Sequence, residues 1–123
     1  MEKSLLAEFD GFDEDYPACE DYDLWIKVTA HYPVGLLRQK YLTKYGGHDD
    51  QLSTTSDILD LYRMNAIFNL LKTKKLTVFQ MEETLKILRK KYKIVKNGAQ
   101  KRQNRGVLDK IVPIGDFIEG LAY

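Results

Sequence analysis

The chain has 123 residues, of which 44% are hydrophobic and 30% charged, and its formal net charge is +1. This size and composition are typical of one globular domain, with or without an appendage, and exclude an intrinsically disordered chain. The single cysteine, Cys19, excludes an internal disulfide framework and a cysteine-rich zinc site. No apolar run is long enough to span a bilayer, and we expect a cytoplasmic protein.

The charge is divided unevenly along the chain. Residues 1–62 carry 13 Asp or Glu and five Lys or Arg, a net charge of −8. Residues 63–123 carry five Asp or Glu and 14 Lys or Arg, a net charge of +9. Such asymmetry predicts two segments with different roles. We place the first segment at residues 1–53 and a helical tail at 54–123.

The first segment is expected to contain two helices separated by an acidic loop. A short helix is predicted over residues 2–9, followed by the loop at 10–19. A second helix is predicted from about Glu20 to His31, because its apolar residues recur on one face. Proline disfavours helix in the residue before it, so the Tyr32-Pro33 pair should end this helix.

Residues 34–47 favour extended structure. They are rich in β-branched, aromatic and leucine side chains, which predicts one or two short strands. The glycine pair Gly46-Gly47 allows a sharp turn that would present His48.

The tail is predicted to be helical. The cluster Ser53–Asp57 should begin a helix over residues 57–73, and Thr77 should cap a second helix that runs to about Lys96. Apolar residues of this second helix alternate spacings of three and four, which defines a heptad seam of Val78, Met81, Leu85, Leu88, Tyr92 and Val95.

The end of the tail is expected to be interrupted twice. Asn97-Gly98 should end the second tail helix, and the polar, basic residues 99–106 are predicted to form an exposed linker. Residues 107–121 are amphipathic but contain Pro113, so we expect a break or a kink there.

Three motifs in the first segment occur in an order and spacing that resemble glycosyltransferase family 2. They are Gly11-Phe12-Asp13-Glu14, Glu20-Asp21-Tyr22-Asp23-Leu24-Trp25 and Gly47-His48. The resemblance implies an α+β, mainly α-helical chain. This would be the C-terminal part of a GT-A-type α/β domain, a helix plus short strands, followed by a helical tail.

The resemblance also implies that part of such an enzyme is missing. The family's nucleotide-binding strands and its D-x-D-type motif have no counterpart here, so Met1 is expected to be an internal methionine of a longer enzyme or the start of a truncated chain. The Q-x-x-R-W motif of processive synthases is absent, which favours transfer of a single sugar. Residues 1–123 alone are expected to be inactive.

The resemblance assigns roles to individual residues. Asp21 would be the catalytic base that removes the proton from the acceptor hydroxyl, and Glu20, counted with it as catalytic, would help to shape the acceptor site. The acceptor would contact Trp25, Asp13 and Glu14. The plain alternative is that Glu20 and Asp21 are helix-start acids that interact with the macrodipole, and that the aromatic residues belong to the core.

His48 is the candidate metal ligand. In related enzymes a histidine at this point completes the coordination of Mn or Mg beside the diphosphate, so one of these ions is expected in the complete enzyme and none in the isolated chain. The alternative is a loop histidine that hydrogen-bonds to backbone.

The acidic segment is compatible with two other chemistries. Cys19 could be a thiol nucleophile, but nothing in the sequence places either histidine near it. A lone cysteine is usually a small apolar residue. Paired carboxylates also occur in glycoside hydrolases, which have no local spacing to test.

The expected partners are a nucleotide-sugar donor and a glycan or lipid-linked acceptor. Residues 88–105 interleave cations with apolar side chains, so they could contact the inner face of a membrane or form the solvated face of a helical bundle. No nucleic-acid-binding motif accompanies the charge. The heptad seam and unpaired apolar residues of the first segment predict a homodimer. The alternative function is a non-catalytic helical interaction module or a truncated relic of such an enzyme.

Overall fold

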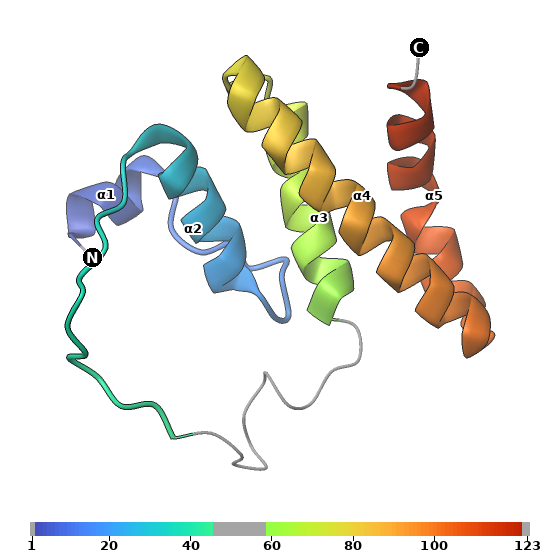
Figure 1. Ribbon diagram of the computed structural model, residues 1–123, viewed down its shortest axis with the longest axis horizontal. Helices are drawn as coiled ribbons and strands as arrows, with labels where there is room; N and C mark the ends of the chain where they lie inside the picture. The colour runs from blue at the N-terminus through green and yellow to red at the C-terminus, as the bar shows by residue number, and fades with distance from the viewer. Residues whose placement is uncertain (1, 46–58, 122–123) are drawn as a thin grey trace. The chain divides into compact units, whose positions relative to one another are not determined.

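The computed structural model describes residues 2–45 and 59–121, which contain five α-helices and no strand (Figure 1). The chain divides into two compact units, residues 1–59 (unit 1) and residues 60–123 (unit 2). The predicted α+β fold is therefore wrong, because the described residues form helices and irregular segments and no strand.

Unit 1 contains α1 (Lys3–Glu8) and α2 (Glu20–His31), so the predicted bounds of the second helix are confirmed. The two helices are tied together at their C-terminal ends. The Tyr32 hydroxyl donates to both carboxylate oxygens of Glu8, at 2.7 and 2.8 Å, and the Phe9 ring meets the His31 ring edge-on at 5.5 Å. The hydrogen bond to Glu8 raises the pKa of Tyr32, because the bond requires the phenol proton.

The predicted strands at 34–47 do not form within residues 34–45, which the structure describes as irregular and exposed. A β-strand satisfies its backbone N–H and C=O groups only by pairing with a neighbouring strand. The described residues contain no second strand, so the extended propensity of this segment has nothing to pair with. A fragment of a GT-A-type α/β domain, with its short strands, is therefore not what the described chain forms.

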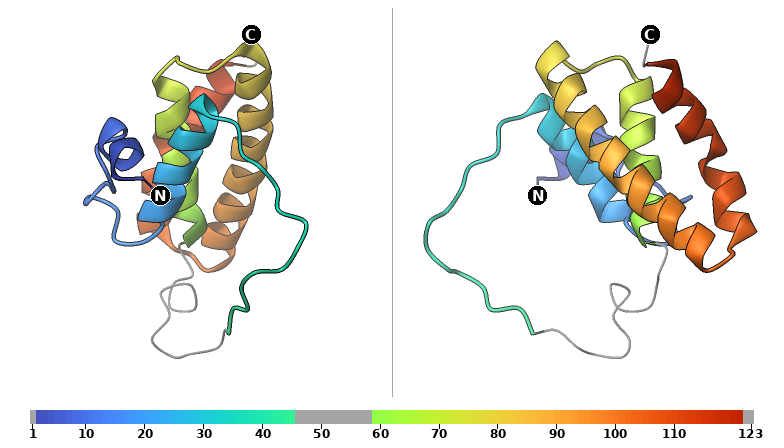
Figure 2. Two further views of the ribbon diagram at one scale, coloured as in Figure 1. Left: turned by 90° about the vertical axis from the view of Figure 1, so that its left-hand side faces the viewer. Right: turned by 45° about the vertical axis from the view of Figure 1, so that its right-hand side comes forward.

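Unit 2 is built from α3 (Leu59–Lys72), α4 (Val78–Lys101) and α5 (Arg105–Gly120). Each helix runs antiparallel to the one before it, as both views of Figure 2 show. The most deeply buried side chains of this unit come from all three helices and include Leu61, Met64, Leu88, Ile111 and Ile114. The heptad seam is only partly buried, since Leu88 is fully covered whereas Val78 is 76% exposed.

The predicted start of α4 is confirmed and its predicted end is wrong. Thr77 and Gln80 form a reciprocal capping box, with each side chain bonded to the backbone N–H of the other. The helix continues through Asn97 and Gly98 to Lys101.

The chain reverses between α4 and α5 within three residues, so the predicted linker at 99–106 is mostly helix. Gln103 takes a left-handed conformation, with φ of 54°, and its backbone N–H donates to the Gln100 carbonyl. The Asn104 N–H donates to the Ala99 carbonyl. These two bonds close α4 in a Schellman motif. The Asn104 side chain then accepts from the Val107 N–H and caps α5. The hydrogen bonds of this Schellman motif stabilise the end of α4 at Lys101. They outweigh the tendency of Asn97-Gly98 to end the helix earlier.

α5 is not broken at Pro113, contrary to prediction. Proline removes one intrahelical hydrogen bond, the one to the carbonyl four residues earlier, which here is that of Asp109. Both Pro113 and Asp109 lie on the exposed side of α5, where water can satisfy that carbonyl. Burial of Ile111 and Ile114 on the other side holds the helix together.

Polar and aromatic contacts join α3 to the other two helices of unit 2. The Lys91 ammonium of α4 lies 3.1 Å from Oδ1 of Asp60 in α3. The Arg63 guanidinium, also in α3, lies 3.3 Å from the same oxygen. The Phe68 and Phe117 rings meet edge-on at 5.2 Å. Burial alone raises the pKa of Asp60, but the hydrogen bonds and charges of Lys91 and Arg63 outweigh this effect and lower it.

α4 and α5 approach closely at Gly115, which is buried. A Cβ atom at this position would overlap the Tyr92 hydroxyl oxygen and lie 3.0 Å from Tyr92 Cζ. The space that a side chain would need is therefore filled by the end of the Tyr92 ring.

We predict that Gly115→Ala lowers the free energy of unfolding by about 1–3 kcal/mol, because the new methyl group must displace the packed Tyr92 ring. Chemical denaturation followed by circular dichroism measures the change. Gly106→Ala is the matched control, since a Cβ there meets only the Asn104 Oδ1 atom at 3.6 Å. Equal effects of the two substitutions would contradict the close contact at Gly115.

We predict that the Asp60–Lys91 contact stabilises the protein above the ordinary aspartate pKa of about 3.9. The lowered pKa of Asp60 means that the folded state holds its proton less tightly than the unfolded state does. This contribution is therefore lost as the pH falls through the folded-state pKa.

Denaturation of the wild type and of Asp60→Asn from pH 7 to pH 2 tests this prediction. The variant should be less stable at pH 7, by less than about 1 kcal/mol because the pair is partly exposed, and the difference should vanish at pH 2. Lys91→Gln, which removes the partner, should behave in the same way. A difference that does not vary with pH would contradict the prediction.

Candidate functional site

The acidic loop between α1 and α2 begins with a sharp reversal. Asp10 and Gly11 are both left-handed, with φ of 59° and 69°. The Gly11 N–H donates to the Leu6 carbonyl at 2.8 Å and the Asp10 N–H to the Ala7 carbonyl at 3.1 Å, so α1 ends in a Schellman motif. Glycine takes this conformation without steric cost. The Gly-Phe-Asp-Glu motif therefore starts at the point where the chain leaves α1.

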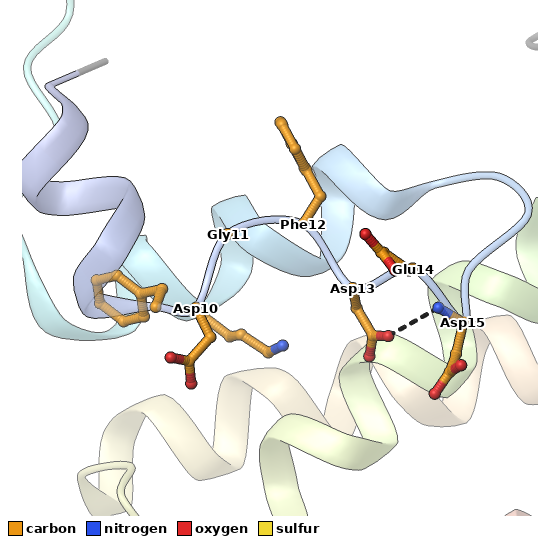
Figure 3. Close-up of a pocket in the computed structure, with 8 residues that line it drawn as sticks. Asp10, Gly11, Phe12, Asp13, Glu14 and Asp15 are labelled. Atoms are coloured by element: carbon orange, nitrogen blue, oxygen red, sulfur yellow. Dashed lines mark hydrogen bonds between the residues drawn. The ribbon is translucent and has the colours of Figure 1, made fainter.

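The loop surrounds an open hollow of about 520 Å³, which is lined by Phe9, Asp10, Gly11, Phe12, Asp13, Glu14, Asp15 and Lys27. Figure 3 shows the carboxylates of Asp10, Asp13 and Asp15 on one side of the loop, with Phe12 on the other. Asp13 Oδ1 accepts from the Asp15 N–H at 3.0 Å, which fixes the orientation of that carboxylate. Of the predicted acceptor residues, Asp13 and Glu14 thus line one hollow.

The acids at the start of α2 have three different environments. Cys19, with φ of 64°, precedes the helix, and Glu20, Asp21 and Asp23 occupy its first turn. Asp21 is exposed and its Oδ1 accepts from the Tyr22 N–H at 2.7 Å. Glu20 is half-buried and Asp23 is buried. Carboxylates in the first turn interact favourably with the helix macrodipole. Asp21 is therefore the first-turn acid of α2 that is open to solvent.

Trp25 follows Asp21 by one helical turn and is 47% exposed. Residues four apart in a helix lie on the same side, so the carboxylate of Asp21 and the indole ring of Trp25 are neighbours on the exposed side of α2. The prediction that Trp25 is available to a ligand is compatible with this exposure. Glu20, Asp21 and Trp25 do not line the hollow of the acidic loop, so the structure groups the predicted residues into two sets.

Asp23 and Lys27 form an ion pair that the sequence analysis did not single out. The Asp23 side chain is 2% exposed, and its Oδ2 accepts from the Lys27 ammonium at 2.6 Å. A buried carboxylate needs such a partner. The spacing of four between an acid and a lysine in a predicted helix was the signal that could have identified the pair. Lys27 also lines the hollow, which brings a cation among its carboxylates.

The predicted metal ligand, His48, lies outside the described residues, as do the Gly46-Gly47 turn and the Ser53–Asp57 cluster. Among residues 2–45 and 59–121, no three His, Cys, Asp or Glu side chains gather in an arrangement that could hold a metal ion. The carboxylates of the acidic loop therefore do not make a metal site by themselves.

The surroundings of Cys19 do not support thiol chemistry. Its sulfur lies 3.8 Å from the Leu59 carbonyl oxygen and the residue is half-buried. His31, the one described histidine, bonds through Nδ1 to the Lys27 carbonyl at 2.9 Å near the end of its own helix. Cys19 precedes the first turn of that helix, so the two residues lie at its opposite ends.

Comparison with known proteins gives no match: no family model, no curated protein and no solved structure resembles the chain significantly. Among the described helices, none combines the length and the apolar character needed to cross a membrane.

Proposed function

We propose that this chain is the acceptor-binding part of a nucleotide-sugar-dependent glycosyltransferase that transfers one sugar to a hydroxyl group. One observation carries the proposal. Asp21 and Trp25 are exposed together on one side of α2, while the nearby Asp23 is buried and paired. The motif that resembles family 2 enzymes thus presents a carboxylate and an aromatic ring to solvent.

Asp21 is the base in the proposed reaction. Its carboxylate takes the proton of the acceptor hydroxyl as the acceptor oxygen bonds to the anomeric carbon of the donor. The bond from that carbon to the diphosphate oxygen breaks, and its electron pair leaves with the nucleotide diphosphate. A base for this step must be accessible to the acceptor hydroxyl, which agrees with the exposure of Asp21 at the start of α2.

Trp25 and the acidic loop bind the acceptor in this proposal. An exposed indole ring offers a flat apolar face against the C–H groups of a sugar. The carboxylates of Asp13 and Glu14 can accept hydrogen bonds from sugar hydroxyls, and Glu20, half-buried beside Asp21, shapes the site. Lys27 offsets part of the negative charge around the hollow.

Mn or Mg belongs to the proposed complete enzyme and would assist the departure of the nucleotide diphosphate. His48 is its proposed ligand. The described residues hold no group of metal-binding side chains, so we derive no step through the metal from them.

The single tryptophan gives a direct test of the acceptor site. We predict that oligosaccharides ending in a free acceptor hydroxyl change the fluorescence of Trp25 and that Asp21→Asn weakens this binding. A panel with glucose, galactose and N-acetylglucosamine termini is the probe. Asp116→Asn, which removes an exposed carboxylate of α5, is the matched control. A fluorescence signal that no sugar changes would contradict the proposed site.

Catalysis is tested in an enzyme that also carries a donor-binding half. There, Asp21→Asn should lower kcat by about two to four orders of magnitude because the base is lost, while donor affinity changes little because Asp21 lies on the acceptor side of the proposed site. Near-normal turnover of this variant would remove Asp21 from the role of base. Residues 1–123 alone should show no turnover and no micromolar binding of nucleotide sugars in calorimetry.

A non-catalytic helical interaction module is the second candidate, and one observation favours it. Six large apolar or aromatic side chains of one segment are between 71% and 88% exposed, namely Val34, Leu36, Leu37, Tyr41, Leu42 and Tyr45. Burying one such side chain stabilises a protein by about 1.5–3 kcal/mol, so their exposure favours association.

We expect the chain to form a symmetric homodimer through this segment. Sedimentation equilibrium over a wide concentration range measures the association. Leu37→Ser with Leu42→Ser should shift the equilibrium to monomer, whereas Ile87→Ser with Ile94→Ser, an equal apolar loss on α4, should not. A monomeric wild type at high concentration would refute the dimer.

A further inference from the structure

α4 has two chemically different sides. One side packs within unit 2, where Leu88 and Ala99 are fully buried and Tyr92 is half-buried. The opposite side carries five exposed basic residues, which we call the cationic face: Lys86, Arg89, Lys90, Lys93 and Lys101. In the left view of Figure 2, α4 forms one edge of unit 2. With 24 residues it is about 36 Å long.

Apolar residues border the cationic face. Ile87 is 50% exposed and Ile94 is 53% exposed, and the two lie one above the other because they are seven residues apart. Phe79, in the first turn of the helix, is 71% exposed. The outer side of α4 therefore combines cations with large unburied apolar side chains.

The remaining charges of α4 define the extent of the cationic face. Glu82 and Glu83 lie toward its N-terminal end, where Glu83 pairs with Lys86 at 2.5 Å. Lys91 belongs to the inner side, since it contacts Asp60, and the Lys96 ammonium lies 5.7 Å from the centre of the Tyr92 ring. From Arg89 onward the exposed charges of the helix are all positive.

We propose that α4 lies on the surface of an anionic lipid bilayer, with its cationic face on the lipid phosphates and Ile87 and Ile94 at the headgroup boundary. A bilayer interface offers negative charge and an apolar layer within a few ångströms of each other, which matches both kinds of side chain. A nucleic-acid backbone would neutralise the cations but would leave the isoleucines in water. This inference is independent of the sugar-transfer proposal, because no residue of α4 takes part in that chemistry.

Sedimentation of the full chain with phosphatidylglycerol and phosphatidylcholine vesicles tests the proposal. The chain should bind the anionic vesicles and not the neutral ones. Lys90→Glu with Lys93→Glu should weaken the binding about tenfold or more, because each basic residue near an anionic surface contributes separately. Binding should fall as salt rises from 0.1 M to 1 M, since screening shortens the range of the attraction.

Lys75→Glu with Lys110→Glu is the matched control, because it makes the same change of net charge at exposed residues outside α4. This control should bind the anionic vesicles nearly as well as the wild type does. Circular dichroism of each variant establishes that the helices remain folded. Equal loss of binding in the two double variants would overturn the proposal, because net charge alone would then explain it.

A second measurement tests the depth of α4. In a Trp25→Phe background, Ile94→Trp should shift its fluorescence to the blue and be quenched by brominated lipids when anionic vesicles are added. An unshifted, unquenched signal would overturn the proposed orientation. Binding of an RNA or DNA duplex as tight as the binding of anionic vesicles would overturn the choice of partner.

Discussion

The 3.6-residue repeat of the α-helix, together with the need to bury one side of each helix, determines which side chains of this protein can meet a ligand. In α2 the repeat turns Leu24, Asp23 and Val28 inward and leaves Asp21 and Trp25 outside. In α4 it buries Leu88 and leaves a row of cations in water. Charged residues that are close in the sequence therefore have unlike environments.

Asp21 and Asp23 illustrate this point within one turn. They are separated by one residue, yet Asp23 is enclosed and neutralised by Lys27 at 2.6 Å while Asp21 is exposed. Removing one partner of a buried pair leaves an uncompensated charge, so Asp23 has a structural role. The exposed carboxylate of Asp21 remains accessible from solvent. The two acids of the same motif thus differ in accessibility, and Asp21 is the one that a ligand could reach.

Close packing in unit 2 depends on complementary shapes as well as on apolar burial. The absence of a side chain at Gly115 allows the Tyr92 ring to reach the α5 backbone, and the Phe68 and Phe117 rings meet edge-on between α3 and α5. The Asp60–Lys91 contact adds a charged link from α3 to α4. These contacts hold α4 with its polar side outward, so the basic residues of the cationic face are exposed.

Much of the helical content could be predicted from the sequence alone. The bounds of α2 and the Thr77 cap of α4 follow from local signals, namely apolar periodicity, first-turn acids and capping side chains. The motifs singled out Asp21 and Trp25, but the exposure of both side chains is a finding of the structure. Local rules suffice here because a helix satisfies its backbone hydrogen bonds within its own segment.

The tertiary structure decided what local rules could not. Extended propensity at 34–45 gave no strand, since pairing needs a partner that the described residues do not contain. α4 continues through Gly98 because a Schellman motif stabilises its later end. α5 continues through Pro113 because Ile111 and Ile114 are buried on its inner side. The burial of Asp23 beside an exposed Asp21 was likewise decided by packing, since two acids in one turn have the same intrinsic preference and only their surroundings differ.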